Sequence, residues 1–202
     1  MIALAANARA QTAPPRGTNA LRDMDAAIQS LTTSVAPSVV QVLVSGYRAI
    51  EDPNRNDTGL VIGRQRSLGS GAIIDADGYI VTNAHVVSGA QQVRVVLHAS
   101  SANGAPLQSL ASDDGMTVPA TIVGVAKDID LALLKINRTG LRPLPLADYD
   151  LVRQGQLVFA FGSPDGLRNS VTMGVVSSAA RQVDADSPSV YVQTDAPINP
   201  GN

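Results

Sequence analysis

Residues 67–87, SLGSGAIIDADGYIVTNAHVV, decide the fold of this 202-residue chain. Two apolar runs, at residues 73–74 and 79–81, flank the pair Asp77 and Gly78. Because glycine tolerates the positive φ of a tight turn, this pattern predicts a β-hairpin. The second strand leads to His85, one of only two histidines in the chain. A histidine at a strand end is held rigidly and can face a cleft, so His85 is a candidate general base.

Two plainer interpretations of this stretch stay open. A histidine beside apolar residues is more often a structural residue than a catalytic one. Residues 75–78, DADG, also match the start of a calcium-binding loop, which would need a glutamate at its twelfth position. Val86 stands at that position. A turn is therefore a better interpretation of Asp75 and its neighbours than a metal site, and we expect no metal and no cofactor.

The composition favours strands packed around an aliphatic core. Hydrophobic residues make up 45% of the chain and aromatic residues only 3%, so valine, isoleucine and alanine must fill the interior. A net charge of −2 without a long basic run argues against nucleic-acid binding. The absence of cysteine excludes disulfides and thiolate metal sites. No apolar run reaches the length of a membrane-spanning segment.

Three sequence blocks follow one another along the chain: residues 69–87 around His85; residues 128–136, DIDLALLKI; and residues 193–202, QTDAPINPGN. Together they resemble the segments that carry the histidine, the aspartate and the approach to the nucleophile in the HtrA (Deg) family of trypsin-like serine proteases. The resemblance covers roughly residues 36–202. It implies an all-β, two-barrel fold of the trypsin-like (chymotrypsin) type, in which the order His, Asp, Ser is typical.

The resemblance implies that His85 is the general base and that Asp130 is the carboxylate that orients it. A serine hydroxyl needs a base to take its proton, and that base needs a third group to hold its tautomer. Asp128 is the competing carboxylate, but Asp130 directly precedes the Leu-Ala-Leu-Leu run, as the family's aspartate does. At the mouth of an apolar strand Asp130 should be partly buried, where a charge is tolerated only if it is paired.

The family's nucleophilic serine would stand at position 203, one residue beyond Asn202. Gly201 matches the family glycine whose backbone N–H forms half of the oxyanion hole. We therefore expect the 202 residues by themselves to be inactive, with a second barrel that cannot close and open strand edges that promote aggregation. Ser163 lacks the G-x-S-x-G elbow, and nothing places Ser70 opposite His85, so neither is expected to replace the nucleophile.

The first 35 residues read as an N-terminal extension. Residues 1–10 end in Ala-Arg-Ala, the small-x-small form of a signal-peptide cleavage site, so they are either a signal-peptide remnant or an ordinary disordered terminus. The region 11–35 combines a linker with two prolines, over residues 11–19, and a helix over residues 21–35. The helix is predicted because apolar residues recur there at helical spacing.

The two barrels should occupy residues 36–140 and, incompletely, 141–202. Residues 46–66 are polar and rich in turn formers, and they predict a loop too long for a plain connection. Residues 181–189 are also polar and resemble the loop that senses activating ligands in the family. Strands are expected over residues 38–45, 92–97, 118–125, 131–136, 156–161, 170–177 and 191–194.

Two functions fit this sequence. The first is a serine endopeptidase of HtrA type that cleaves unfolded or misfolded proteins in the periplasm or after secretion. The second is a catalytically inactive protease-like binding or chaperone module, which a residue other than serine at position 203 would favour. Intact His85 and Asp130 favour the first, because an inactive site need not keep them. The resemblance also implies a homotrimer and a C-terminal PDZ domain beyond this chain.

Overall fold

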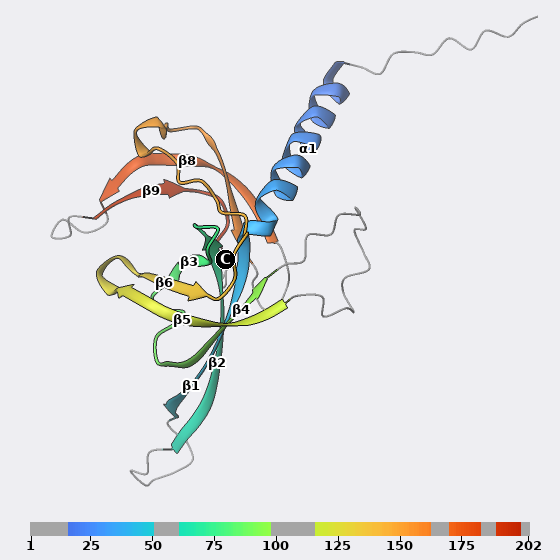
Figure 1. Ribbon diagram of the computed structural model, residues 1–202. Coiled ribbons are helices and arrows are strands. Elements are labelled where there is room, and N and C mark those ends of the chain that lie inside the picture. The colour runs from blue at the N-terminus through green and yellow to red at the C-terminus, as the bar shows by residue number, and fades with distance from the viewer. Residues whose placement is uncertain (1–15, 51–60, 98–115, 163–169, 183–188, 199–202) are drawn as a thin grey trace, which may run out of the picture. The chain divides into compact units, whose positions relative to one another are not determined.

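The computed structural model describes residues 16–50, 61–97, 116–162, 170–182 and 189–198 (Figure 1). The chain forms two compact units, residues 1–34 and residues 35–202. The described residues hold one α-helix, and the other long elements are strands, which confirms the prediction of an all-β fold with a short N-terminal helix. The boundaries proposed between the two barrels stay predictions.

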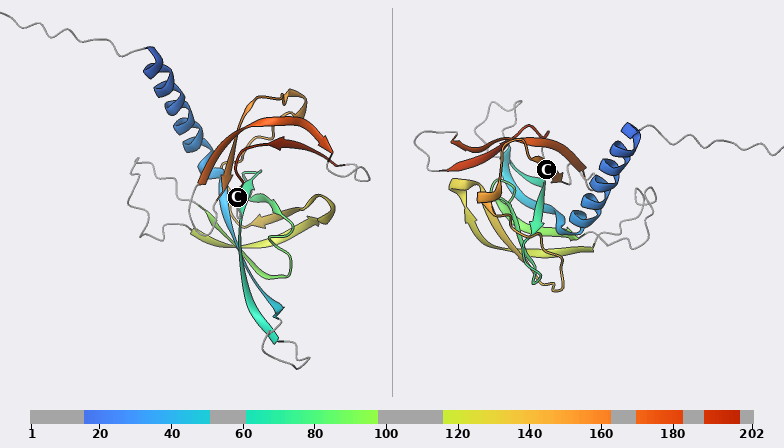
Figure 2. Two further views of the ribbon diagram at one scale, coloured as in Figure 1. Left: turned by 180° about the vertical axis from the view of Figure 1, so that it is seen from behind. Right: turned by 90° about the horizontal axis from the view of Figure 1, so that it is seen from above.

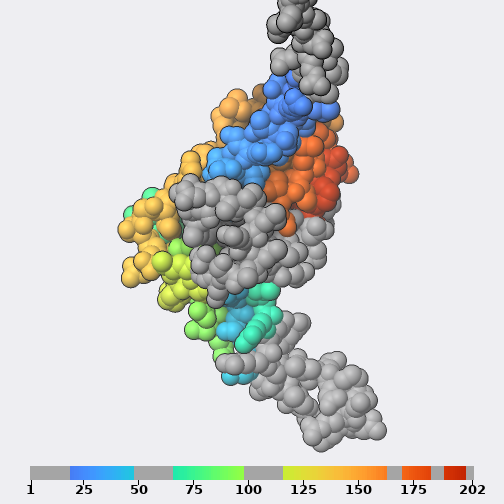
Figure 3. Space-filling model, turned by 90° about the vertical axis from the view of Figure 1, so that its right-hand side faces the viewer, coloured from blue at the N-terminus to red at the C-terminus, as the bar shows by residue number. Residues whose placement is uncertain are grey.

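Helix α1 (Arg16–Val35) is longer than predicted. It begins within the segment that we expected to be a linker, because a proline disrupts a helix only from inside it and the residue after Pro15 is free to start one. Its end matches the prediction, since Pro37 follows Val35 by two residues. Leu21 is exposed on this helix, which is the blue surface in Figure 3. In the described parts of the chain, no helix combines the length and apolar character needed to span a membrane.

Six antiparallel strands close into a barrel in the order β1-β2-β3-β6-β5-β4. Strand β4 returns beside β1, as in a Greek key, and β6, the last of the six in sequence, closes the barrel by pairing with both β5 and β3. We call the β3–β6 pair the closing seam. The strands are β1 (Val39–Ile50), β2 (Val61–Ile73), β3 (Tyr79–Asn83), β4 (Ala90–Leu97), β5 (Met116–Ala126) and β6 (Leu131–Ile136).

The hairpin between β2 and β3 is as predicted. Gly78 has a φ of 97°, and the Ile74 N–H donates to the Tyr79 carbonyl at 2.9 Å. The Asp75 carboxylate accepts the Asp77 N–H at 2.8 Å, which is an interaction typical of a turn. In the described ranges, no group of three His, Cys, Asp or Glu residues is placed to hold a metal ion. The turn predicted over residues 75–78 is confirmed by its backbone hydrogen bonds, including the one from the Gly78 N–H to the Asp75 carbonyl at 3.1 Å.

The prediction of a loop over residues 46–66 was wrong at both ends. Strand β1 continues to Ile50 and β2 begins at Val61, with a paired register from Gly46 opposite Gln65 to Ile50 opposite Val61. This pair extends beyond the barrel as a two-stranded ribbon (Figure 1). A two-stranded ribbon can be held together by backbone hydrogen bonds without apolar alternation in its sequence. The many polar residues and turn formers of residues 46–66 therefore led to the prediction of a loop where the outer parts of β1 and β2 lie.

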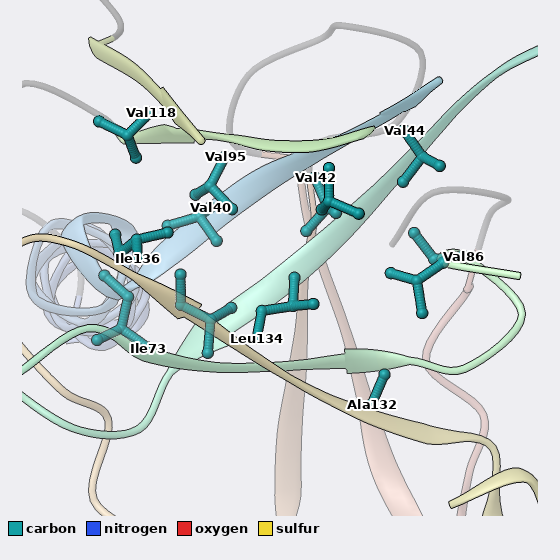
Figure 4. Packing of buried hydrophobic residues seen from close by; sticks show 13 residues of the cluster. Val40, Val42, Val44, Ile73, Val86, Val95, Val118, Ala132, Leu134 and Ile136 are labelled. Carbon is teal, nitrogen blue, oxygen red and sulfur yellow. The ribbon is translucent and has the colours of Figure 1, made fainter. Parts of the chain in front are cut away.

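The barrel interior is an aliphatic core, as the composition predicts. Alternate residues of β3 and β6 point inward, so Ile80 is almost completely buried. Leu134 and Ile136 are buried in the same way (Figure 4). Burying one such side chain contributes about 1.5–3 kcal/mol. The remaining core residues are Val40, Val42, Val44, Ile73, Val86, Val87, Val93, Val95, Val118 and Ala132.

A second antiparallel sheet has the order β7-β8-β9 (Figure 2). It consists of β7 (Leu157–Gly162), β8 (Ser170–Gln182) and β9 (Val190–Thr194). These are the three strands predicted for the second barrel, and β8 runs on into the segment predicted to be a loop from residue 181. The segment between β6 and β7 is mostly irregular, and backbone hydrogen bonds connect it to the β2–β3 hairpin. For example, the Leu144 N–H donates to the Ile73 carbonyl at 2.8 Å.

Candidate catalytic site

The closing seam brings together two segments that are distant in sequence. Asn83, the last residue of β3, pairs with Leu131, the first residue of β6. The residues just beyond these strand ends must therefore lie side by side. The backbone confirms this, because the Ala84 N–H donates to the Asp130 carbonyl oxygen at 3.1 Å.

His85 and Asp130 form a two-point contact. Nδ1 of His85 lies 2.7 Å from Oδ2 of Asp130, and the backbone N–H of His85 donates to Oδ1 at 2.9 Å. An ionised carboxylate only accepts hydrogen bonds, so the Nδ1 nitrogen is the one that carries the proton. This tautomer leaves Nε2 of His85 as a proton acceptor, which is what a general base requires.

The backbone of Asp130 is unusual. Its φ is 52° and its ψ is 43°, which is the left-handed helical region, and it is the only non-glycine residue with positive φ in the described parts of the chain. Such a conformation is sparsely populated outside glycine, although aspartate and asparagine tolerate it best. It follows a short 3₁₀ turn, Lys127–Ile129, and turns the carboxylate back toward β3.

Hydrogen bonds hold the pKa of the Asp130 carboxyl below its ordinary value. The largest contribution is the hydrogen bond with the His85 side chain, followed by the His85 backbone N–H. The His85 charge and a side-chain hydrogen bond from Asn83 act in the same direction, while desolvation opposes them. The side chains of His85 and Asp130 are 71% and 46% exposed, so Asp130 is half-buried, as predicted, and His85 is open to a ligand.

Two open clefts meet at His85. One, of about 410 Å³, lies on the side of the β1–β2 ribbon, and the other, of about 400 Å³, lies on the side of Asp130. The first is lined by Val44, Gly46, Tyr47, Ser67, His85, Val86, Ser88 and Gly89. The second is lined by Ala84, His85, Val87, Ser88, Gly89, Val125, Lys127 and Asp130. His85, Ser88 and Gly89 line both clefts.

The structure also places the other residues named from the sequence. Asp128 is exposed in the 3₁₀ turn, and the carboxylate that meets His85 is that of Asp130. Ser70 lies in β2, where its carbonyl accepts the Thr82 hydroxyl at 2.7 Å. The predicted oxyanion glycine, Gly201, and the rejected Ser163 lie outside the described residues.

Sequence reasoning missed Asn83. Its side-chain Nδ2 donates to the Asp130 carbonyl at 3.1 Å and to Oδ2 at 3.2 Å. The available signal was an amide side chain at the end of an apolar strand, two residues before the histidine. Its partner lies 47 residues away in sequence, so no local pattern could have named it.

A family model described as "Trypsin-like peptidase domain" matches residues 69–202. The chain belongs to the trypsin-like peptidase family. The match includes both strands of the closing seam together with His85 and Asp130.

Curated relatives of this trypsin-like peptidase place it among the HtrA/Deg proteases. A protein named "Probable periplasmic serine endoprotease DegP-like" from Halomonas elongata is 43% identical over 138 residues, or 68% of this chain. A protein of the same name from Ectopseudomonas mendocina is 41% identical over 143 residues, or 69% of this chain. The matched segment spans only 26% and 27% of these relatives, about a quarter of their length.

Solved structures of HtrA-type proteases confirm the trypsin-like fold. A variant of the HtrA-type protease AlgW with a decapeptide superposes with a TM-score of 0.71 at 30% identity, over 86% of this chain and 52% of that one. AlgW with a tripeptide gives a TM-score of 0.63 at 32% identity, over 85% of this chain and 48% of that one. The predicted resemblance to the HtrA (Deg) family is thereby confirmed.

Proposed function

We propose that this protein is a serine endopeptidase of HtrA type that cleaves unfolded or misfolded polypeptides. The observation that carries the proposal is the 2.7 Å contact between His85 Nδ1 and Asp130 Oδ2. In a trypsin-like fold this contact is half of the apparatus that activates a serine. We also propose a periplasmic or secreted location, which is supported by the periplasmic relatives.

In this proposal the nucleophile is a serine at position 203, directly after Asn202. His85 Nε2 takes the proton from the serine hydroxyl while the oxygen attacks the peptide carbonyl, and the same proton then passes to the leaving amine. Asp130 stays ionised and stabilises the imidazolium that forms between these two steps. The N–H of Gly201 donates to the carbonyl oxygen as negative charge develops on it. No cofactor takes part.

The substrate in this proposal is an extended polypeptide. The two clefts beside His85 support it, because a chain that crosses the imidazole would have space on both sides. An unfolded protein exposes such extended segments, whereas a folded one does not. From the family resemblance we further propose a homotrimer with a PDZ domain beyond this chain, in keeping with curated relatives of about four times the matched length.

The test is an assay of the protein extended through position 203 to its natural end, with an unfolded protein as substrate. His85→Ala should lower kcat by roughly 10⁶-fold, as loss of a catalytic residue does in subtilisin. Asp130→Asn should lower it by about 10⁴-fold, because the asparagine amide favours the wrong imidazole tautomer.

Asp128→Asn is the matched control, since it makes the same change two residues away on an exposed turn, and it should leave kcat unchanged. Cleavage that survives in His85→Ala would end the assignment of the base. Binding of the unfolded substrate without any cleavage by the unmodified protein would favour the inactive binding or chaperone module instead.

A further inference from the structure

The side chain of Asn83 reaches two different atoms of Asp130. Its Nδ2 donates to the backbone carbonyl oxygen at 3.1 Å and to the carboxylate Oδ2 at 3.2 Å. Oδ2 is also the atom that meets His85 Nδ1 at 2.7 Å. One amide therefore contacts both the backbone and the functional group of the residue that orients the imidazole.

Asp130 needs such support for two reasons. Its backbone is in the left-handed region, from which a non-glycine residue relaxes readily unless its surroundings hold it there. Its side chain is 46% exposed, so water competes for the carboxylate oxygens. A carboxylate that rotated by a fraction of a turn would lose both hydrogen bonds to His85.

We propose that Asn83 is a positioning residue: its amide fixes the left-handed backbone and the carboxylate rotamer of Asp130, and thereby sets the tautomer and orientation of His85. The catalytic consequence of this role rests on the proposed function, whereas the structural role does not. The Ala84 N–H also donates to the Asp130 carbonyl, but within the described part of the chain the Asn83 side chain alone contacts both that carbonyl and the carboxylate.

The chemistry of an amide suits this position. The NH₂ group carries two protons, so it supplies one to the carbonyl and one to the carboxylate. A hydroxyl of serine or threonine has a single proton and could satisfy only one of the two acceptors. An aspartate at position 83 would face Asp130 with acceptors and a like charge, which would destabilise the ionised carboxylate.

A purely structural role for Asn83 makes a different prediction. The backbone of Asn83 pairs with Leu131 at the closing seam, and this pairing does not need the side chain. If Asn83 only extended the strand, its truncation would leave Asp130 and His85 unchanged. If it positions Asp130, truncation would change the ionisation of Asp130 and the hydrogen bond at His85 Nδ1 even in a fully folded protein.

The experiment is NMR of the complete protein, labelled with ¹³C at aspartate carboxyls and ¹⁵N at histidine rings. In Asn83→Ala we expect the pKa of the Asp130 carboxyl to rise and the downfield Nδ1–H resonance of His85 to broaden or disappear. Asn83→Asp should raise the pKa of Asp130 further. Asn137→Ala removes an exposed asparagine just after β6 and should leave both signals unchanged.

A change in the orientation of Asp130 and His85 should also be visible in the kinetics. A misplacement of about 1 Å in a catalytic group can cost 10²-fold, so Asn83→Ala should lower kcat by about 10- to 100-fold with little change in KM. If the protein proves inactive for other reasons, the NMR signals still decide the structural role.

Asn83→Ser keeps one donor proton and replaces Asn83→Ala in the NMR experiment if the alanine variant does not fold. It should give a smaller rise in the pKa of Asp130 than the alanine variant would. The proposal is overturned if a folded Asn83→Ala protein keeps both the pKa of the Asp130 carboxyl and the Nδ1–H resonance of His85. If the alanine variant does not fold, the same result in folded Asn83→Ser overturns it.

Discussion

Position 130 has to satisfy two requirements at once, a carboxylate aimed at an imidazole and a backbone in the left-handed region. Aspartate is one of the few residues that can do both, because its short polar side chain lowers the cost of positive φ. Glutamate would carry the same charge, but its longer chain would displace the oxygens from His85. The choice between Asp128 and Asp130 therefore depends on conformation as much as on sequence context.

The depressed pKa of Asp130 predicts a pH dependence of stability. An unfolded aspartate titrates near pH ~3.9, and the folded carboxyl titrates lower. Its contribution to the free energy of unfolding is therefore fully present above about pH 4 and is lost as the pH falls through the folded-state pKa. Urea unfolding of the unmodified protein and of Asp130→Asn should show a stability difference that shrinks from pH 4 downward. A difference that stays constant down to pH 2 would contradict this.

At the residue scale, the sequence predicted the pair but not its support. His85 and Asp130 were recognisable because each lies in a block of residues with a characteristic order. The left-handed conformation of Asp130 and the role of the Asn83 amide were not recognisable, because Asn83 and Asp130 meet only in the folded barrel, 47 positions apart in sequence. Whether the pair performs proteolysis, with Gly201 beside it, stays a prediction.

At the scale of elements, the hairpin between β2 and β3 and the closing seam determine where the site forms. Gly78 is essential to this hairpin for two independent reasons. Its φ of 97° is strained for any other residue, and a Cβ there would lie 2.6 Å from the Ile136 carbonyl oxygen. The same glycine also accepts the Ile136 N–H at 3.0 Å, which ties the hairpin to the end of β6.

Gly78→Ala should therefore destabilise the protein, by at least about 1–3 kcal/mol for the backbone strain alone. Gly124→Ala is the matched control, because Gly124 has no positive φ and a Cβ there would meet nothing within 4 Å. It should leave the free energy of unfolding unchanged or raise it by about 0.4–1 kcal/mol. Chemical denaturation measures both, and equal effects of the two substitutions would show that the turn at residue 78 is not under constraint.

Elements were predictable where the pattern was local. The strand over residues 131–136 was predicted with its observed bounds, because a nearly continuous apolar run, LALLKI, follows two aspartates. Helix α1 was found but begins earlier than predicted, since nothing before residue 21 repeats at helical spacing. The outer parts of β1 and β2 were missed because they are paired through their backbones, and backbone pairing leaves no hydrophobic pattern in the sequence.

At the scale of the whole barrel, stability depends on a small aliphatic core. Leu134 is completely buried on the closing seam, and it is surrounded by the valines and isoleucines of the other strands (Figure 4). With so few aromatic residues, no large side chain can make up for a gap. The loss of one buried leucine should therefore lower the stability of the whole barrel.

Leu134→Ala should lower the free energy of unfolding by about 2–5 kcal/mol, because it removes buried surface and leaves a cavity. Leu146→Ala makes the same chemical change at a side chain that is 85% exposed, and it should have little effect. Urea denaturation of the two variants gives the comparison. A loss below about 1 kcal/mol for Leu134→Ala would mean that the barrel can collapse around the missing side chain.

The position of the His85–Asp130 pair at the end of the closing seam has a consequence for the newly made protein. While the chain is being synthesised, the imidazole leaves the ribosome first, and two further strands, β4 and β5, must follow before β6 can bring the acid. A nascent polypeptide that ends anywhere between His85 and Asp130 carries the histidine without its partner. Closure of the barrel and assembly of the His85–Asp130 contact therefore both depend on the pairing of β6 with β3.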